Sequence, residues 1–206
     1  MAASGQQIAR APVLRTQRLV VRTIVPDDAA AVAALAGDWQ VARMLADMPH
    51  PLSADMAARW THAAVGERCL AITRAGEMIG SVSACVIEGN DGSLGSGHAA
   101  RHDADALPAE LGFWLGRAWW GHGYAREAVA AVIAGLQAVG DVTWLQSGHF
   151  TDNPASGRLL TALGFTPTGT TTQWCLARQE TLPAVRYELR PAVAATNPHP
   201  ARQARG

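Results

Sequence analysis

Alternating apolar and polar positions predict seven strands along the chain. Short runs rich in β-branched, aromatic or other apolar residues, bounded by turn residues, are typical of strands. These runs are Leu19–Val25, Cys69–Thr73, Met78–Ile87, Ala109–Gly116, Val142–Gly148, Thr170–Ala177 and Ala184–Leu189. The second and third runs are joined by residues 74–77, which we expect to form a hairpin turn.

Helical spacing of apolar residues, together with capping residues, predicts four helices between these strands. They span residues 26–36, 54–65, 124–139 and 153–163. Ser53 is expected to cap the second helix and Gly164 to end the fourth. The order of the elements predicts an α/β fold, a mixed sheet flanked by helices, and not the regular alternation of a doubly wound fold.

Length and composition are those of a single globular domain. The chain has 206 residues, of which 49% are hydrophobic and 17% charged, which suffices for a real core. We place the domain at residues 13–190 and expect 1–12 and 191–206 to be flexible tails. No apolar stretch is long enough for a secretory signal or a membrane span, so we expect a soluble, cytoplasmic protein.

Charge and ligand chemistry narrow the classes of function. Seventeen basic and seventeen acidic residues balance to zero, which argues against nucleic acid or a membrane surface as a partner. The three cysteines show no metal-binding spacing. His98, His102 and Asp103, in the patternless segment 88–107, match no standard ligand set. We therefore expect no metal, and we expect 88–107 to be a loop over the substrate side.

A glycine-containing segment lies between a predicted strand and a predicted helix. Gly121, Gly123 and Ala125 at alternate positions let the backbone approach a ligand closely, and the start of the next helix favours a phosphate. The alternative is a simple tight turn. The chain has no lysine, which excludes a P-loop. An NAD-type dinucleotide site stays open, with Asp141 as the ribose-binding acid, although Arg126 stands where that fingerprint has its third glycine.

Two segments in order resemble the signatures of the GNAT superfamily of N-acetyltransferases. Glu110–Gly116 followed by Trp119–Ala128 is similar to the family's loop for the pyrophosphate of coenzyme A. Asp152–Ser156 followed by Leu159–Phe165 resembles the second signature. Together with Leu19–Arg22, they resemble the branch that acetylates the N-termini of ribosomal proteins.

The resemblance covers residues 14–190 and implies a GNAT-like acyl-CoA N-acyltransferase fold, with a mostly antiparallel mixed sheet of six or seven strands. It implies acetyl-CoA as co-substrate, no metal, and a primary amine as acceptor, either a protein N-terminus or a small molecule. The amine would attack directly in a ternary complex, and a homodimer would fit this branch. The residues implied to bind the coenzyme are Phe113, Trp114 and Leu115 in the strand, Trp120, Gly121, His122, Gly123, Tyr124 and Ala125 in the loop, and Asn153.

Two residues are candidates for the proton transfers. Glu110 is the candidate general base, because it is the only acid in an apolar strand just before the expected acetyl site. Its alternative is a strand-end carboxylate that faces water. Ser156 is the candidate acid, from its resemblance to the Asn-x-x-Ser pattern of the ribosomal branch. Its alternative is a first-turn serine that bonds to the backbone.

One departure from the family keeps a second function open. Many members carry a tyrosine as general acid where this chain has Leu160, which cannot donate a proton. A coenzyme A-binding protein that has lost catalysis is therefore the alternative to an active enzyme. Tyr187, in the last predicted strand, is expected to pack in the core or to line the acceptor pocket.

Overall fold

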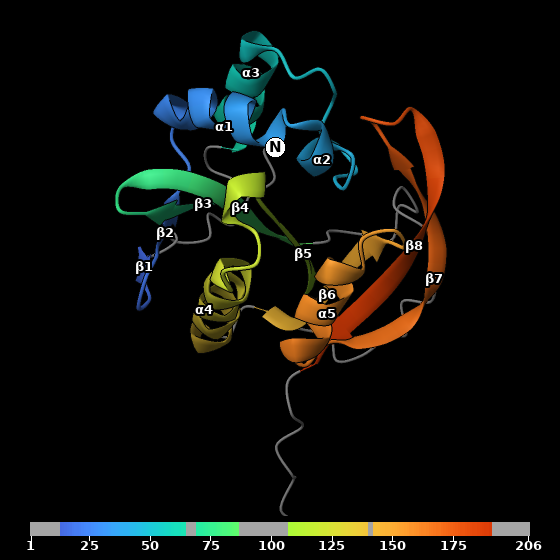
Figure 1. Ribbon diagram of the computed structural model, residues 1–206. Helices are drawn as coiled ribbons and strands as arrows, with labels where there is room; N and C mark the ends of the chain where they lie inside the picture. The colour runs from blue at the N-terminus through green and yellow to red at the C-terminus, as the bar shows by residue number, and fades with distance from the viewer. Residues whose placement is uncertain (1–12, 65–68, 87–106, 140–141, 191–206) are drawn as a thin grey trace, which may run out of the picture.

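One sheet of eight strands organises the computed structural model, which describes residues 13–64, 69–86, 107–139 and 142–190 (Figure 1). The strands are β1 (Leu14–Arg15), β2 (Val20–Thr23), β3 (Cys69–Arg74), β4 (Glu77–Val86), β5 (Leu107–Leu115), β6 (Val142–Phe150), β7 (Thr166–Cys175) and β8 (Glu180–Leu189). The helices are α1 (Ala29–Ala36), α2 (Trp39–Ala42), α3 (Ala54–Ala64), α4 (Tyr124–Val139) and α5 (Pro154–Ala162), with short 3-10 turns at Pro26–Asp28 and Arg117–Trp119.

The sheet is mixed and mostly antiparallel, as expected. Its strand order is β1-β2-β3-β4-β5-β6-β8-β7. Every neighbouring pair is antiparallel except β5 and β6, which are parallel and connected through α4. The eighth strand, beyond the six or seven expected, is the two-residue β1, which is too short to produce an apolar pattern.

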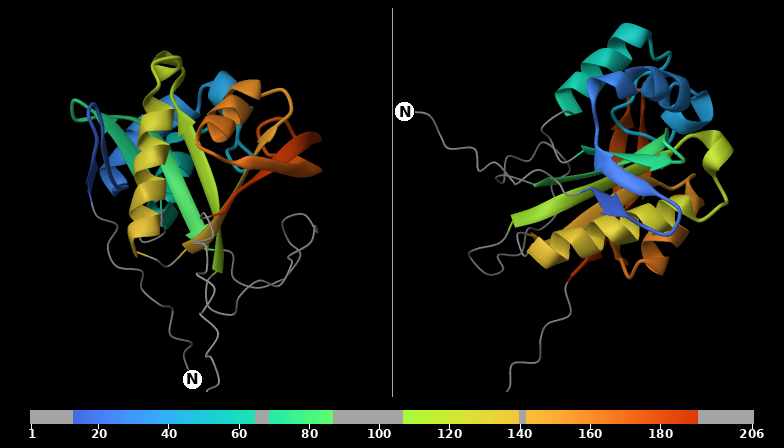
Figure 2. Two further views of the ribbon diagram at one scale, coloured as in Figure 1. Left: turned by 90° about the horizontal axis from the view of Figure 1, so that it is seen from below. Right: turned by 90° about the vertical axis from the view of Figure 1, so that its left-hand side faces the viewer.

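The helices cover both faces of the sheet. Helices α1, α2 and α3 lie on one face and α4 and α5 on the other, and Figure 2 shows the same two layers from the side. Helix α4 buries its apolar stripe, with Val129, Val132 and Ile133 at most 7% exposed. Separate clusters of apolar side chains fill the space on each face of the sheet.

Turn and cap residues predicted the β3–β4 turn, the start of α3 and the end of α5. In the β3–β4 turn, Ala75 and Gly76 have φ of 50° and 89°, the left-handed geometry of tight hairpins. The Ser53 hydroxyl accepts a hydrogen bond from the Met56 N–H at 3.2 Å, so Ser53 caps α3. Gly164 follows α5 with φ of 89°.

The largest differences between the expected elements and the structure are at α2, β7 and β8. The one-turn helix α2 was not predicted, because four residues show no helical period; the Asp38 carboxylate caps it by accepting from the Gln40 N–H at 2.7 Å. Strands β7 and β8 begin four residues earlier than expected, at Thr166 and Glu180. Pro167 and Pro183 weaken the strand signal there, since proline cannot donate to a ladder.

Several expectations concern residues outside the described ranges. They are the two tails, most of the segment 88–107, and the histidines and aspartate within it. In the part of the chain that the structure describes, no three His, Cys, Asp or Glu side chains are grouped so that they could hold a metal ion. No helix in that part is both long and apolar enough to cross a bilayer.

A buried ion pair fixes the start of the first helical segment. The Arg22 guanidinium donates to both oxygens of Asp28, at 2.8 and 2.7 Å, and the Val25 N–H donates to the same carboxylate at 2.9 Å. The Asp28 side chain is only 7% exposed. Burial would raise the pKa of Asp28, but the hydrogen bonds from Arg22 and Val25 and the charge of Arg22 hold the pKa below its ordinary value.

We predict that Asp28→Asn lowers the free energy of unfolding by about 1–3 kcal/mol at pH 7, because a buried charge-assisted pair is lost. The pKa of Asp28 is lower in the folded protein than in the unfolded chain, where it is 3.8, so the ionised carboxylate stabilises the fold fully above that pH. This stabilisation is lost as the pH falls through the pKa of the folded protein. The difference from wild type should therefore shrink near pH 3, as measured by urea unfolding. Asp27→Asn, an exposed neighbour, is the control; a difference that is unchanged at pH 3 would contradict this assignment.

Candidate active site

A cleft opens where the two central strands part. The parallel strands β5 and β6 are paired only as far as Glu110 and Gln146. Beyond that point β5 stays paired with β4 up to Leu115, and β6 with β8 up to Phe150. The strands diverge, and the cleft that includes this gap has a volume of about 1420 Å³. Seen from below in Figure 2, α4 and α5 lie on opposite sides of the gap.

Strand alternation decides which backbone groups of β5 face the cleft. In an antiparallel pair, successive residues direct their N–H and C=O groups to one neighbour and then to the other. The Leu111 carbonyl accepts from Ser147 Oγ at 2.8 Å, and the Leu115 carbonyl accepts from Trp120 Nε1 at 2.8 Å, so both face away from β4. Phe113 lies midway between them and has the same orientation. Its N–H and C=O therefore point into the cleft.

The loop before α4 contains two glycines with a left-handed backbone. Gly121 and Gly123 have φ of 78° and 79°, which residues with a Cβ rarely adopt. A Cβ on Gly121 would meet no atom within 4 Å, so conformation and not crowding requires glycine there. Both glycines line the cleft together with Tyr124 and Ala125, so the N-terminal end of α4 meets it.

Arg18, in the turn between β1 and β2, braces this loop. Its Nε donates to Glu127 Oε2 at 2.7 Å and its Nη1 to the His122 carbonyl at 3.0 Å. The guanidinium carbon lies 4.6 Å from the centre of the Tyr124 ring, and that ring stacks on His122 at 5.4 Å. Cation, aromatic ring and carboxylate together hold the loop against the first two strands.

The carboxylate of Glu127 is the anchor of this brace. Thr16 Oγ1 donates to it at 2.5 Å, and the Arg18 N–H donates at 2.9 Å. Burial would raise the pKa of Glu127, but the hydrogen bonds from Thr16 and from the backbone and guanidinium of Arg18 hold the pKa below its ordinary value. Glu127 is therefore a structural anion in the first turn of α4, where the helix dipole also favours it.

Helix α5 presents its first turn to the other side of the cleft. Asn153 caps it, with Oδ1 accepting from the Ser156 N–H at 3.3 Å. The Ser156 side chain lines the cleft, and its hydroxyl makes no hydrogen bond within the described residues. Leu160, one turn further on, is fully buried in the apolar core, so no side chain with an acidic proton stands at that position.

Glu110 lies at the point where the strands part, and it is paired. The Arg186 guanidinium of β8 donates to Oε1 at 3.0 Å and to Oε2 at 2.6 Å. Arg186 also lies 3.4 Å from Gln146 Oε1. The carboxylate is one third exposed, so water reaches it. Arg186 thus fixes the direction of Glu110 while leaving it open to the cleft.

Three charged groups form an ion-pair cluster beside the cleft, and one of them, Asp152, lines it. Asp152, in the turn before α5, pairs with Arg43 and with Arg178, both at 2.8 Å. Arg178 belongs to the β7–β8 turn, and its Nε also donates to the Arg43 carbonyl at 2.8 Å. The hydrogen bond from Arg178 and the charges of both arginines hold the pKa of Asp152 below its usual range. We call this group of Arg43, Asp152 and Arg178 the tip latch.

Most of the predicted site residues meet at this cleft. Those that line it are Glu110, Phe113, Trp114, Leu115, Trp120, Gly121, Gly123, Tyr124, Ala125, Asn153 and Ser156. His122 does not line it and instead stacks on Tyr124. Trp120 is 44% exposed, and its Nε1 donates to the Leu115 carbonyl.

Several cleft residues were not assigned to the site from the sequence. Arg186 carried no signal, because its pairing with Glu110 depends on strand register. Arg126 was considered only as the residue that replaces a fingerprint glycine, but it is exposed, lines the cleft and has no ion pair among the described residues. His149 lies beyond the predicted end of its strand, on the same face as Ser147.

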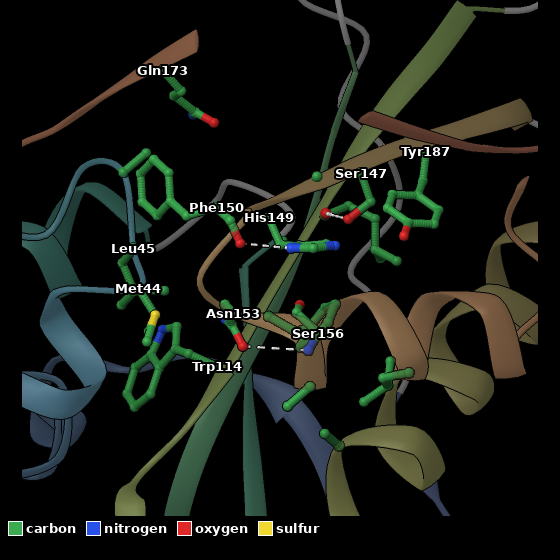
Figure 3. Close-up of a pocket in the computed structure, with 18 of the residues that line it drawn as sticks. Met44, Leu45, Trp114, Ser147, His149, Phe150, Asn153, Ser156, Gln173 and Tyr187 are labelled. Atoms are coloured by element: carbon green, nitrogen blue, oxygen red, sulfur yellow. Dashed lines mark hydrogen bonds between the residues drawn. The ribbon is translucent and has the colours of Figure 1, made fainter. Parts of the chain in front are cut away.

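His149 and Tyr187 lie close to α5 (Figure 3). His149 Nδ1 lies 2.7 Å from the Phe150 carbonyl, so the neutral ring carries its proton there and its lone pair on Nε2. Nε2 is buried and has no hydrogen-bond partner in the described part of the chain. A Cβ on Gly157 of α5 would lie 2.5 Å from Nε2 and 3.1 Å from the Tyr187 hydroxyl. Only glycine permits this approach.

We predict that Gly157→Ala destabilises the protein by about 1–3 kcal/mol, because the added methyl must displace α5 or the two rings. Gly169→Ala is the matched control, since a Cβ there would meet no atom within 4 Å. It should stay within about 0.5 kcal/mol of wild type in chemical unfolding. Equal stability of the two variants would show that α5 does not rest on these rings.

Comparison with known proteins agrees with this geometry. A family model described as an acetyltransferase (GNAT) domain matches residues 18–166. No curated protein matches the chain in a sequence search.

Solved structures share the fold at low identity. An acetyltransferase of the GNAT family from Bacillus anthracis has a TM-score of 0.70 at 14% identity, covering 87% of this chain and 98% of its own. The ribosomal L7/L12 alpha-N-protein acetyltransferase RimL, in complex with coenzyme A, gives 0.69 at 18% identity, with 87% and 97% covered. A ribosomal-protein-S5-alanine acetyltransferase from Vibrio fischeri gives 0.68 at 16%, with 87% and 96% covered.

The family match spans well over half of the chain, and it includes both the glycine loop and the start of α5. The structural neighbours share the overall fold over most of both chains. The chain therefore belongs to the acetyltransferase (GNAT) family.

Proposed function

We propose that this chain transfers the acetyl group of acetyl-CoA to a primary amine, by direct attack across the gap between β5 and β6. The observation that carries the proposal is that the ladder between these strands stops at Glu110, within a cleft that the glycine loop also lines. A carboxylate, open backbone donors and an anion-binding helix end thus share one cavity. The cavity exceeds the roughly 300–1,000 Å³ of ordinary ligand pockets, which suits a large coenzyme plus an acceptor.

The coenzyme phosphates are proposed to bind at Gly121, Gly123 and the N-terminal end of α4. Free N–H groups and the helix dipole favour anions there, and exposed Arg126 supplies a charge. The pantetheine arm would run along β5 and bond to the Phe113 backbone as an added strand does. The resemblance implies that Phe113, Trp114 and Leu115 bind the coenzyme. Of these, Phe113 is favoured as the backbone partner of pantetheine, because its N–H and C=O point into the cleft whereas those of Trp114 face β4.

The reaction forms a C–N bond and breaks the C–S bond of the thioester. A neutral amine attacks the carbonyl carbon, and its proton passes through water to Glu110, which Arg186 holds in place. The Phe113 N–H stabilises the oxyanion; one such donor contributes about 3–4 kcal/mol in comparable sites. The departing thiolate takes a proton from the Ser156 hydroxyl. The proton that Glu110 accepted returns through water to Ser156, so the net reaction moves one proton from the amine to the thiol.

Thermal unfolding with acetyl-CoA, with CoA and with NAD tests the choice of coenzyme. At a hundred times its dissociation constant a ligand adds about 2.7 kcal/mol. For a chain of this size we predict a rise in Tm of roughly 5–10 °C with acetyl-CoA and CoA. A rise with NAD alone, or no rise with either CoA compound, would refute the proposal.

Glu110→Gln and Ser156→Ala test the roles of the two side chains. We predict that each lowers kcat by about 10²-fold or more, with the Tm shift by acetyl-CoA retained. Glu77→Gln, at the exposed start of β4, is the matched control and should leave kcat unchanged.

Unchanged acetyl transfer in both variants would refute this assignment of roles. A wild-type protein that binds acetyl-CoA but acetylates no amine would instead be the coenzyme-binding protein that Leu160 left open. Because Glu110 and Ser156 have different roles, kcat is measured for each single variant and for the double variant.

A further inference from the structure

On the α2-facing side of the cleft, the side chains of β5 and β6 change in character along the strands and form three levels. Alternate residues of a strand share one face, so Glu110, Gly112 and Trp114 of β5 lie on the same face. Gln146, Gly148 and Phe150 lie on the matching face of β6. The levels are therefore a polar level at Glu110 and Gln146, a glycine level at Gly112 and Gly148, and an apolar level at Trp114 and Phe150.

At the glycine level neither strand places a side chain of its own, and both Gly112 and Gly148 line the cleft. The Ser83 hydroxyl borders this level, because a Cβ on Gly112 would lie 3.0 Å from Ser83 Oγ. A Cβ on Gly148 would lie 3.1 Å from the Val185 carbonyl and 3.3 Å from Arg186 Nη1. This level lies just beyond the last pair of the β5–β6 ladder, next to Glu110. An amine that occupies it has the base on one side.

The apolar level is a pocket built from three elements. Met44 and Leu45, after α2, face Trp114 of β5 and Phe150 of β6 across the cleft (Figure 3). Phe150 is 3% exposed, and Arg178 lies 5.5 Å above its ring, which fixes it. The pocket therefore offers a rigid apolar surface to whatever group is attached to the amine.

Among the described residues, the arginines near this end of the cleft are all paired with carboxylates. Arg43 and Arg178 are both paired with Asp152 in the tip latch. Arg186 is paired with Glu110. Asp47 lines the rim, is exposed and has no ion pair among the described residues, which adds negative charge. A carboxylate or phosphate on the acceptor would lose its hydration without gaining a partner.

From these three levels and their charges, we infer that the acceptor is a primary amine carried on a compact apolar group, without a carboxylate or phosphate nearby. The amine lies at Gly112 and Gly148, and its apolar group fills the pocket of Met44, Leu45, Trp114 and Phe150. This inference rests on the proposed acetyl transfer and names the acceptor class for the same site.

Three matched amines test this acceptor class. Phenethylamine differs from ethylamine only by the phenyl ring and from phenylalanine only by the carboxylate. We predict that kcat/KM for phenethylamine exceeds that for ethylamine by about 10- to 100-fold, because the ring is buried. It should exceed that for phenylalanine by about tenfold or more, because a carboxylate would be unpaired. Hexapeptides with N-terminal Ser or Ala are included as peptide acceptors.

A variant of the pocket wall assigns the preference to this site. Met44→Gln should reduce the ratio of phenethylamine to ethylamine activity by about tenfold, since it places an amide against the ring. Met56→Gln, the same change on α3 away from the cleft, should leave the ratio as in wild type. The Tm shift with acetyl-CoA checks that Met44→Gln still folds and binds the coenzyme.

The outcomes separate this inference from the proposed function. Acetylation of the hexapeptides with no preference for phenethylamine over ethylamine would overturn the acceptor class and leave acetyl transfer standing. A preference that Met44→Gln does not change would overturn the assignment to this pocket. Acetyl transfer to none of the amines would overturn the proposed function itself.

Discussion

The end of pairing between β5 and β6 is the constraint on which the rest of the site depends. Up to Glu110 the two strands share a ladder, and beyond it each has a neighbour on one side only. Backbone groups of β5 that would have bonded to β6 are thereby left facing a cavity. In a buried sheet such groups need partners, so a ligand with amide groups of its own is the natural occupant.

Ion pairs between distant segments hold the two sides of this gap. On one side, Arg18 and Glu127 join the first strands to the start of α4. On the other, the tip latch joins α2, the start of α5 and the β7–β8 turn. Isolated surface pairs contribute little, but each of these carboxylates accepts from more than one donor, and that of Glu127 is only 17% exposed. These pairs tie the segments on either side of the cleft to their neighbours.

Sequence could predict what is local and could not predict what depends on register. The loop glycines, the Asn153 cap and the apolar stripe of α4 all follow from spacing along one segment. The pairing of Glu110 with Arg186 depends instead on how β8 aligns with β6, and the pocket at Met44 depends on a helix too short to have a period. The roles assigned to Glu110 and Ser156 remain predictions, because the position of a residue in the cleft does not show which proton transfer it performs.

The tip latch has a consequence for how this enzyme can diversify. Asp152 immediately precedes Asn153, so Arg178 ties the β7–β8 turn to the residue before the cap of α5. Insertions or deletions in the β7–β8 hairpin would pull Arg178 away from Asp152. The length of this hairpin is thus constrained by the cleft as well as by the edge of the sheet that it forms.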